Sequence, residues 1–356
     1  IDSTYILSKI SNFTDDKINT FNFSFDSKNF NSSLLSRSVA KKFHTHHHSI
    51  STNDFDLKND IQLLPKIYDE PFADPSALPM YYLSKYSKNY VKVAYTGDGG
   101  DEVFSGYKRH YFWRLFLKLQ NKNLLKKMLV ILLDNKILNF ANFFNYKYDI
   151  NYLNSNIETI KKILISDNLN LQNLYTISVS KDINALQKVN FKEFKNIKSS
   201  DKEISITNLF CLEYEDYLTN NILVKSDRAC MFNSIENRAP LLNSNLVDYI
   251  NRMNLNNYNK LLKNKFLLKK FLMNEYSNYN LKRKSGFDIP VDDWIKKNFK
   301  DQLYDNLNST NIRNLLSDYF DVNKIIEIFD DYNQNKNDYK FYFWRLLNFI
   351  NWYNYQ

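Results

Sequence analysis

The stretch VKVAYTGDGGDE, residues 91–102, decides the fold class. Its first six residues predict a strand, and a turn rich in glycine and aspartate follows directly. In a parallel sheet such a turn lies at the carboxyl edge, where α/β proteins bind ligands. Glycines there let backbone N–H groups approach an anion, but the three carboxylates of this turn would repel it unless a divalent cation lies between them. The stretch therefore predicts a metal–phosphate site; the alternative is an acidic β–α turn that binds nothing.

Glycine is scarce in this chain, so its positions are informative. Only five glycines occur in 356 residues, whereas average usage would give about 25. Four of them lie within residues 97–106, and the fifth is Gly286. A chain biased toward Asn, Lys, Ile, Tyr and Phe should keep glycine only where a side chain is not tolerated. We therefore expect positive φ or close backbone approach to a ligand in these two places.

The segments on either side of this stretch follow different periodicities. Upstream, residues 20–25 and 46–51 alternate as strands, while residues 32–43, 54–67 and 80–87 have helical patterns. Strands that alternate with helices predict a parallel sheet. Beyond about Arg109 the strand signals fade, and helical patterns separated by Asn-rich turns continue to the C-terminus. The predicted fold class is α/β, with a parallel-sheet lobe over residues 1–108 and a mainly helical lobe over residues 109–356.

Composition narrows the location and the partners. The net charge of +9 admits nucleic acid, an acidic partner or a polyanion such as ATP, but the lysines are spread along the chain as on a solvated surface. Charged residues interrupt the apolar stretch at residues 124–144, which predicts an amphipathic helix and no membrane span. Cys211 and Cys230 lack metal-ligand spacing, and no secretory signal opens the sequence. We expect a cytoplasmic protein without nucleic-acid or membrane partners.

Five segments resemble the asparagine synthetase family in the order in which that family has them. The string YTGDGGDEVFSGYKRH at residues 95–110 is similar to its signature segment beside the ATP site. The other four are DEPFADPS at 69–76, the LVKSDR helix and following turn at 223–242, the K-x-GF block at 282–294 and an aromatic helix at 343–352. The resemblance spans essentially the whole chain. It implies an ATP-pyrophosphatase lobe, of the adenine nucleotide alpha hydrolase type, completed by a helical part.

The first residues, IDST, look like the end of the family's pyrophosphate-binding loop SGGIDST. This likeness implies that the first strand and the start of that loop are missing from the sequence. It also implies a missing N-terminal glutaminase domain that supplies ammonia from glutamine, with a catalytic cysteine that neither Cys211 nor Cys230 represents. A homodimer is left open.

The resemblance assigns the nucleotide and metal site residue by residue. Asp2 and Asp101 would hold Mg²⁺ from opposite sides, although an Asp-Ser-Thr triplet alone is more often a helix cap. The residues expected to bind ATP or its pyrophosphate are Asp2, Ser3, Thr4, Phe23 (near adenine), Thr96 and Gly97.

The catalytic residues are assigned in the same way. Asp98, where many relatives have Glu, would contact the acyl-adenylate and the attacking amine, and Glu102 completes the acidic segment. Lys284 would stabilise the charge that builds as pyrophosphate leaves, and Arg228 would help to hold the phosphates. Two further sets have structural alternatives: Glu236 and Arg238 form either an ion pair or part of the site, and the histidines at 44–48 do not predict a metal site.

The implied reaction is ATP-dependent amidation of aspartate to asparagine through β-aspartyl-AMP, with ATP and Mg²⁺ as cofactors. Ser24 and Pro75 depart from the residues common in the family, which weakens the assignment of aspartate as acceptor more than that of ATP chemistry. The alternatives are a related enzyme that closes a β-lactam or amidates another carboxylate, an RNA-modifying protein with the same loop, and a catalytically silent scaffold. This fragment itself is not assured of activity by the resemblance.

Overall fold

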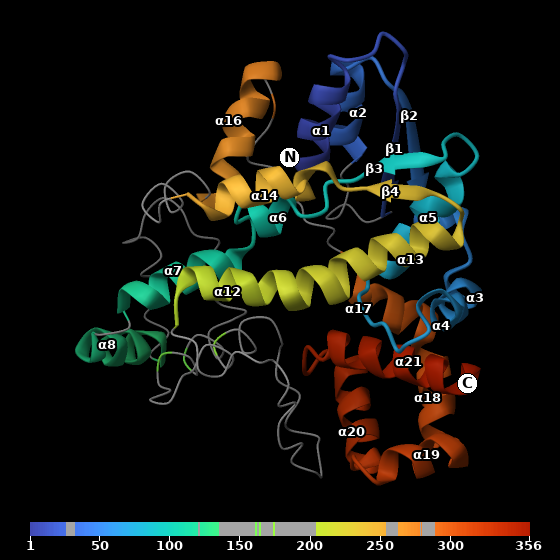
Figure 1. Cartoon of the computed structure of the whole chain (residues 1–356). Coiled ribbons are helices and arrows are strands. Elements are labelled where there is room, and N and C mark those ends of the chain that lie inside the picture. The colour runs from blue at the N-terminus through green and yellow to red at the C-terminus, as the bar shows by residue number, and fades with distance from the viewer. Residues whose placement is uncertain are drawn as a thin grey trace.

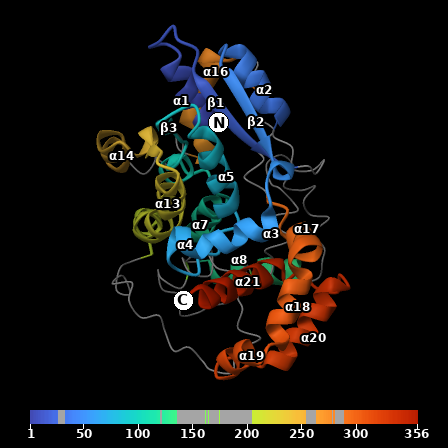
Figure 2. The same ribbon diagram turned by 90° about the vertical axis from the view of Figure 1, so that its right-hand side faces the viewer.

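The computed structural model describes residues 1–25, 33–119, 122–134, 204–253, 263–277 and 289–356, together with residues 161, 164, 174 and 279. Figure 1 shows two ends joined by a long helix that crosses the middle of the molecule. Strands β1 (Asn19–Ser24) and β2 (His46–Ser51) lie at one end, and the C-terminal helices lie at the other. The turned view in Figure 2 shows the same separation.

Two parallel strand pairs make up the described β structure. β1 and β2 pair from Asn19 opposite His46 to Ser24 opposite Ser51, and α2 (Ser33–Lys42) lies between them in the chain. β3 (Val93–Tyr95) pairs in parallel with β4 (Glu236–Arg238). The three strands predicted before residue 109 are confirmed to within two residues at each end, but the described strands form two separate two-stranded sheets, and β3 pairs with a strand beyond residue 109. The strand at residues 236–238 lies in the part expected to be helical and was missed, because three polar residues carry no apolar alternation.

Helices dominate the rest of the described chain, as expected. The long helix of Figure 1 is continuous from Ile206 to Phe232 and runs through α12 (Ile206–Leu212), the π-helix η5 (Glu213–Leu223) and α13 (Val224–Phe232). Ser205 caps its first turn by accepting a hydrogen bond from the Asn208 N–H at 3.1 Å. Besides α2, the other described helices of seven or more residues are α1 (Asp2–Ile10), α5 (Ala77–Ser87), α7 (Lys108–Leu119), α8 (Asn123–Asp134), α14 (Ser244–Asn251), α16 (Phe266–Glu275), α18 (Lys300–Asn308), α19 (Thr310–Ser317), α20 (Val322–Asn333) and α21 (Lys340–Tyr355).

The helix predicted over residues 54–67 is confirmed from Leu57 onward, but its predicted start is wrong. Residues 57–68 are helical without a break, as α3 (Leu57–Asp60), a 3₁₀ turn (Ile61–Leu63) and α4 (Leu64–Tyr68). Pro65 lies in the first turn of α4, where its missing N–H costs nothing. Asp56 caps α3, and Ser51 and Asp54 form a reciprocal capping box on a separate turn, Thr52–Asp54. These caps set the start of the helix at Leu57.

One hydrophobic core joins the sheet end to the C-terminal helices. Phe23 and Ile50 of the β1–β2 pair belong to the same buried cluster as Trp294, Phe343 and Trp344. Helix α21 packs against α4, and α13 packs against both α4 and α5. The predicted division at residue 108 stays a prediction, and the core runs across it.

A second core lies between the long helix and α7. It contains Phe104, Trp113 and Phe210, and it joins α7 to α12. The amphipathic helix expected over residues 124–144 corresponds in part to α8, and residues 135–144 lie outside the described residues. Within the described ranges, no helix is long and apolar enough to cross a membrane.

Candidate active site

The turn after β3 lies against the start of α1. Gly99 has φ +82°, and α6 (Gly100–Val103) begins directly after it. A Cβ at Gly100 would lie 2.6 Å from Cγ of Asp2, closer than real Cβ atoms approach other atoms. The predicted need for positive φ and for close approach is therefore met in this turn, and the group that approaches Gly100 is a side chain of the same chain.

Two carboxylates from distant parts of the chain converge on one lysine. Nζ of Lys265 lies 2.8 Å from Oδ1 of Asp101 and also donates a short hydrogen bond to Oδ2 of Asp2. The Lys265 side chain is only 2% exposed, while those of Asp2 and Asp101 are 20% and 26% exposed. The structure thus brings together the two residues predicted to share a cation, and the ammonium of Lys265 lies between them.

Unusual backbone geometry holds Lys265 in this position. Asn264 and Lys265 have φ values of 53° and 57°, and Ser105 has φ 56°, which is uncommon for residues with a Cβ. Their segments are tied together because the N–H of Lys265 donates to the Phe104 carbonyl at 3.1 Å. A Cβ at Gly106 would lie 2.2 Å from Cε of Lys265, so only glycine leaves room for the lysine stem. Strained backbone of this kind concentrates at functional sites.

The electrostatics of this group favour bound cations. Burial alone would lower the pKa of Lys265, but the two carboxylates outweigh it and raise the pKa above its usual value. Among the described residues, Oδ1 of Asp2 is buried and no hydrogen-bond donor reaches it. A buried carboxylate oxygen without a partner is costly, and a metal ion would satisfy it.

The ligands that these residues offer are those that Mg²⁺ needs. Within the described ranges no three His, Cys, Asp or Glu side chains are grouped to hold a metal. Mg²⁺ does not need such a cage, since proteins usually bind it through one or two carboxylates, with water and substrate phosphates as the other ligands. Asp2 and Asp101 supply those two carboxylates, so the residues fit a magnesium ion that arrives with phosphates.

Asp98 is held at the end of the β3–β4 pair. Its Oδ2 accepts hydrogen bonds from Oγ1 of Thr96 at 2.9 Å and from Nδ2 of Asn237 at 3.4 Å. The N–H of Thr96 donates to the carbonyl of Arg238 at 2.9 Å, which continues the strand pairing. Strand β4 therefore positions a predicted catalytic residue.

Glu102 is buried one helical turn beyond Asp98. It is 2% exposed, and its Oε1 accepts a 2.6 Å hydrogen bond from the Tyr107 hydroxyl. Burial raises the pKa of Glu102 to about 7. A carboxyl group with this pKa can gain or lose a proton near neutral pH.

A second ionic cluster lies further along the same segment. Glu213, at the start of η5, accepts a hydrogen bond at 3.0 Å from Nε of Arg109 and a short one from Nη2, and it also forms a short hydrogen bond with Nε2 of His110. The guanidinium of Arg109 lies over the rings of Tyr107 and Tyr217, at 3.9 and 4.4 Å from their centroids. Burial lowers the pKa of His110 below its usual value, which favours a neutral ring at pH 7.

The remaining predicted residues lie in varied places. Ser3 is exposed in the first turn of α1, whereas Thr4 is buried. Phe23 is 3% exposed, and its ring stacks on Tyr82, so the ring is closed to a ligand. Arg228 is 42% exposed, with Nη1 at 3.7 Å from Oε1 of Glu70. Lys284 and Gly286 lie outside the described residues.

Sequence reasoning missed Lys265, Tyr107 and Glu213. Tyr107 lies inside the signature segment at residues 95–110, and this position is the signal that could have identified it. Lys265 directly precedes an apolar helix, where a lysine normally reaches into solvent, so the sequence carries no signal for its burial. Glu213 lies in a polar stretch with two other acidic residues, Glu215 and Asp216, and nothing distinguishes it from them.

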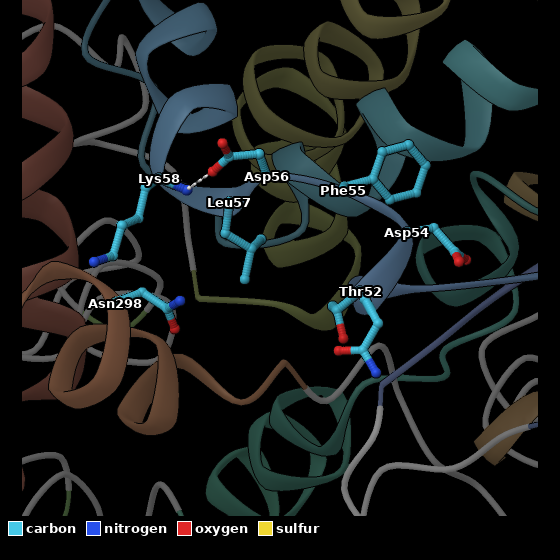
Figure 3. Close-up of a pocket in the computed structure, with 8 residues that line it drawn as sticks. Thr52, Asp54, Phe55, Asp56, Leu57, Lys58 and Asn298 are labelled. Carbon is cyan, nitrogen blue, oxygen red and sulfur yellow. Dashed lines mark hydrogen bonds between the residues drawn. The ribbon is translucent and has the colours of Figure 1, made fainter.

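A surface pocket lies elsewhere in the molecule. It is lined by residues 52–58 and Asn298, and it is open to solvent. Figure 3 shows the lining side chains, among them Asp56, which accepts a hydrogen bond from the Lys58 N–H at 3.1 Å at the start of α3. None of the predicted site residues lines this pocket.

Comparison with known proteins gives a consistent result. The family model described as asparagine synthase matches residues 1–354. "Asparagine synthetase [glutamine-hydrolyzing] 1" of Bacillus subtilis is 24% identical over 383 aligned residues, which cover 99% of this chain and 54% of the relative. A putative asparagine synthetase of Methanocaldococcus jannaschii is 37% identical over 111 residues, which cover 31% of this chain and 21% of the relative. The chain thus spans about half the length of the Bacillus protein.

Proposed function

Because this chain belongs to the asparagine synthase family, we propose that it forms an amide from a carboxylic acid and ammonia at the expense of ATP. The proposed acceptor is aspartate, and the product is asparagine. The β-carboxylate attacks the α-phosphorus of ATP, which gives β-aspartyl-AMP and pyrophosphate. Ammonia then attacks the acyl carbon, AMP leaves, and the nitrogen loses a proton.

The observation that carries this proposal is the convergence of Asp2 and Asp101 on one cation beside the turn after β3. Polyphosphate chemistry needs positive charge at this place, because charge moves onto the leaving pyrophosphate. Mg²⁺ bound by the two carboxylates would neutralise that charge. Ser3, exposed in the first turn of α1, would donate its hydroxyl to the same phosphates, and the first-turn N–H groups, Thr4 included, would face them.

The base and the sugar of ATP would lie against the strands. The peptide at Thr96 and Gly97 follows β3 and is proposed to contact the nucleotide. Because the Phe23 ring is buried, we propose that adenine meets β1 through its backbone. Both contacts would place the α-phosphorus near the carboxyl end of the strands.

Two acidic residues are proposed to serve the amide-forming step. Asp98, fixed by Thr96 and Asn237, would hold the attacking ammonia beside the acyl-adenylate. Glu102 would take up the proton that the nitrogen loses, because a pKa of about 7 suits both uptake and release.

Two basic residues complete the proposal. Lys284 would act on the phosphates as pyrophosphate leaves. Arg228, exposed on α13, would approach the phosphates from the helical part. The relatives are named as glutamine-hydrolysing enzymes, and ammonia for this chain would come from glutamine through a glutaminase domain.

A related acceptor is the second candidate, and one observation favours it. Asp98 is one methylene shorter than the Glu of many relatives, and its carboxylate is already bonded to Thr96 and Asn237. The space in front of Asp98 would then accept a larger acid than aspartate. An amidation of another carboxylate, or closure of a β-lactam, would use the same adenylation chemistry.

The test is ATP–pyrophosphate exchange with the purified protein and each of several acids. Aspartate-dependent exchange, with asparagine formed on addition of ammonium chloride, would support the proposed acceptor. Exchange that depends on another acid would favour the second candidate. Absence of exchange with every carboxylate in a folded protein would contradict the adenylation proposal.

A further inference from the structure

We propose that the ammonium of Lys265 occupies the position between Asp2 and Asp101 that Mg²⁺ would take, and that Mg²⁺ therefore binds only together with the nucleotide. The ammonium lies between Asp2 and Asp101, so a bare metal ion that binds both carboxylates meets a cation already held there. A polyphosphate chain would supply the displaced ammonium with new partners. This inference rests on the proposed use of ATP.

The charges of the cluster set up this competition. Two carboxylates and one ammonium leave a net charge of −1, which attracts a divalent cation. However, Nζ of Lys265 is hydrogen-bonded to one oxygen of each carboxylate, so a metal that binds both carboxylates lies close to this ammonium. Two cations around the same oxygens repel each other strongly in a poorly solvated site.

Burial makes displacement of Lys265 costly. The side chain is 2% exposed, and its stem passes Gly106 so closely that a Cβ there would lie 2.2 Å from Cε. Its backbone is held in a left-handed conformation between Asn264 and the start of α16. The ammonium therefore has no easy route to water, and loss of both carboxylate partners would leave a buried charge unpaired.

A polyphosphate removes that cost. It brings negative oxygens to the same place, so the ammonium can keep a partner while Mg²⁺ takes the carboxylates. Oδ1 of Asp2, which has no hydrogen-bond partner among the described residues, would gain a partner in the metal. Metal and nucleotide should then bind with strong mutual enhancement, which is reciprocal by thermodynamic linkage.

The experiment measures Mn²⁺ retained by the protein in equilibrium dialysis, without nucleotide and with ATP. The wild-type protein should retain almost no Mn²⁺ alone and about one equivalent with ATP. In Lys265→Met, which removes the charge and keeps the length, Mn²⁺ alone should bind on the order of 100-fold more tightly than in the wild type.

Two further variants locate the effect. Adding Asp101→Asn to Lys265→Met should abolish the gained binding. Lys9→Met is the matched control, because Lys9 makes a 2.7 Å pair with one carboxylate, Glu275, and is 40% exposed; its Mn²⁺ binding should equal that of the wild type.

The outcomes separate the two proposals. If the wild type binds Mn²⁺ alone as tightly as with ATP, Lys265 does not exclude the metal from the two carboxylates, although the ATP proposal stands. That result needs no variant, so it can still overturn the inference if Lys265→Met does not fold. If the wild type retains neither Mn²⁺ nor ATP when both are present, the inference and the proposed function fall together.

Discussion

The segment at residues 96–110 contributes to two ionic clusters that differ in the numbers of their acidic and basic groups. In the first, the carboxylates of Asp2 and Asp101 share one ammonium, that of Lys265. In the second, a single carboxylate, Glu213, serves both Arg109 and His110. The first cluster has a net charge of −1 and the second, with neutral His110, a net charge of zero.

This difference separates a site for ligands from a structural joint. The first cluster has negative charge in excess and an acidic oxygen, Oδ1 of Asp2, without a partner. In the second, both oxygens of Glu213 are engaged, and the unpartnered atom is Nδ1 of neutral His110, which carries no charge. A net negative charge attracts a cation, whereas a charge-balanced cluster stabilises the packing of helices.

The largest expected effect is on the structural joint. Glu213→Ala leaves Arg109 buried without a counter-charge and removes the acceptor of His110. We expect the free energy of unfolding to fall by about 3–5 kcal/mol, measured by urea denaturation. Glu215→Ala, an exposed change on the same helix, is the control. A loss no larger than the control's would show that Glu213 is not needed for packing.

The ligand site should respond in rate and hardly in stability. Asp101→Asn keeps an oxygen near Nζ of Lys265 and leaves Asp2 in place, so the melting temperature should change little. Acid-dependent ATP–pyrophosphate exchange should fall on the order of 10²–10³-fold, because the ligand that balances transition-state charge is weakened. Asp305→Asn, exposed on α18, should leave both unchanged. A large fall in the melting temperature of Asp101→Asn would mean that this cluster stabilises the fold and would contradict its role as a ligand site.

Glu102, which lies between the clusters, should make stability depend on pH. Its pKa is about 7 in the folded protein, against an ordinary value of 4.5. Between these values the folded protein holds a proton that the unfolded chain has released, so stability falls as pH rises. Relative to Glu102→Gln, the wild type should lose about 3 kcal/mol of unfolding free energy from pH 4.5 to above pH 7.

The measurement for Glu102 is urea unfolding of both proteins at several pH values. Glu327→Gln, an exposed substitution on α20, gives the background slope. A pH-independent difference between wild type and Glu102→Gln would mean that Glu102 titrates normally and is a poor proton acceptor.

The smallest effect is expected at an exposed pair. Glu236 and Arg238 on β4 form a 2.6 Å contact, and both side chains are more than half exposed. Solvent and salt screen such pairs, so Glu236→Ala should leave the melting temperature and the exchange rate unchanged within error. A clear loss of exchange with an unchanged melt would instead give this pair a role in the site.

The sequence predicted the elements whose signals are local. The alternation at residues 20–25 and 46–51 gave the parallel pair, and the glycine-rich turn indicated where Asp98 and Asp101 lie. Convergence of Asp2 and Asp101 was expected only through resemblance to a family, since nothing in their spacing shows it.

The features that were missed depend on long-range contacts. Strand β4 is polar and short, and it exists because β3 offers it an edge. By contrast, the helix expected over residues 54–67 starts only at Leu57 because of a local cap at Asp56, which periodicity ignores. Burial of Lys265 depends on Gly106 and on two carboxylates far away in sequence, so no window around residue 265 contains the information.

The pairing of β3 with β4 also sets the order in which the molecule can mature. Asn237 is 139 residues from Asp98, and Lys265 is 263 residues from Asp2. During synthesis the early carboxylates emerge long before the groups that hold them, and closing such large loops is slow. The nascent sheet end should therefore expose an unpaired β3 edge until the chain has passed residue 238. Until then, this edge is open to chaperones and to unwanted strand pairing.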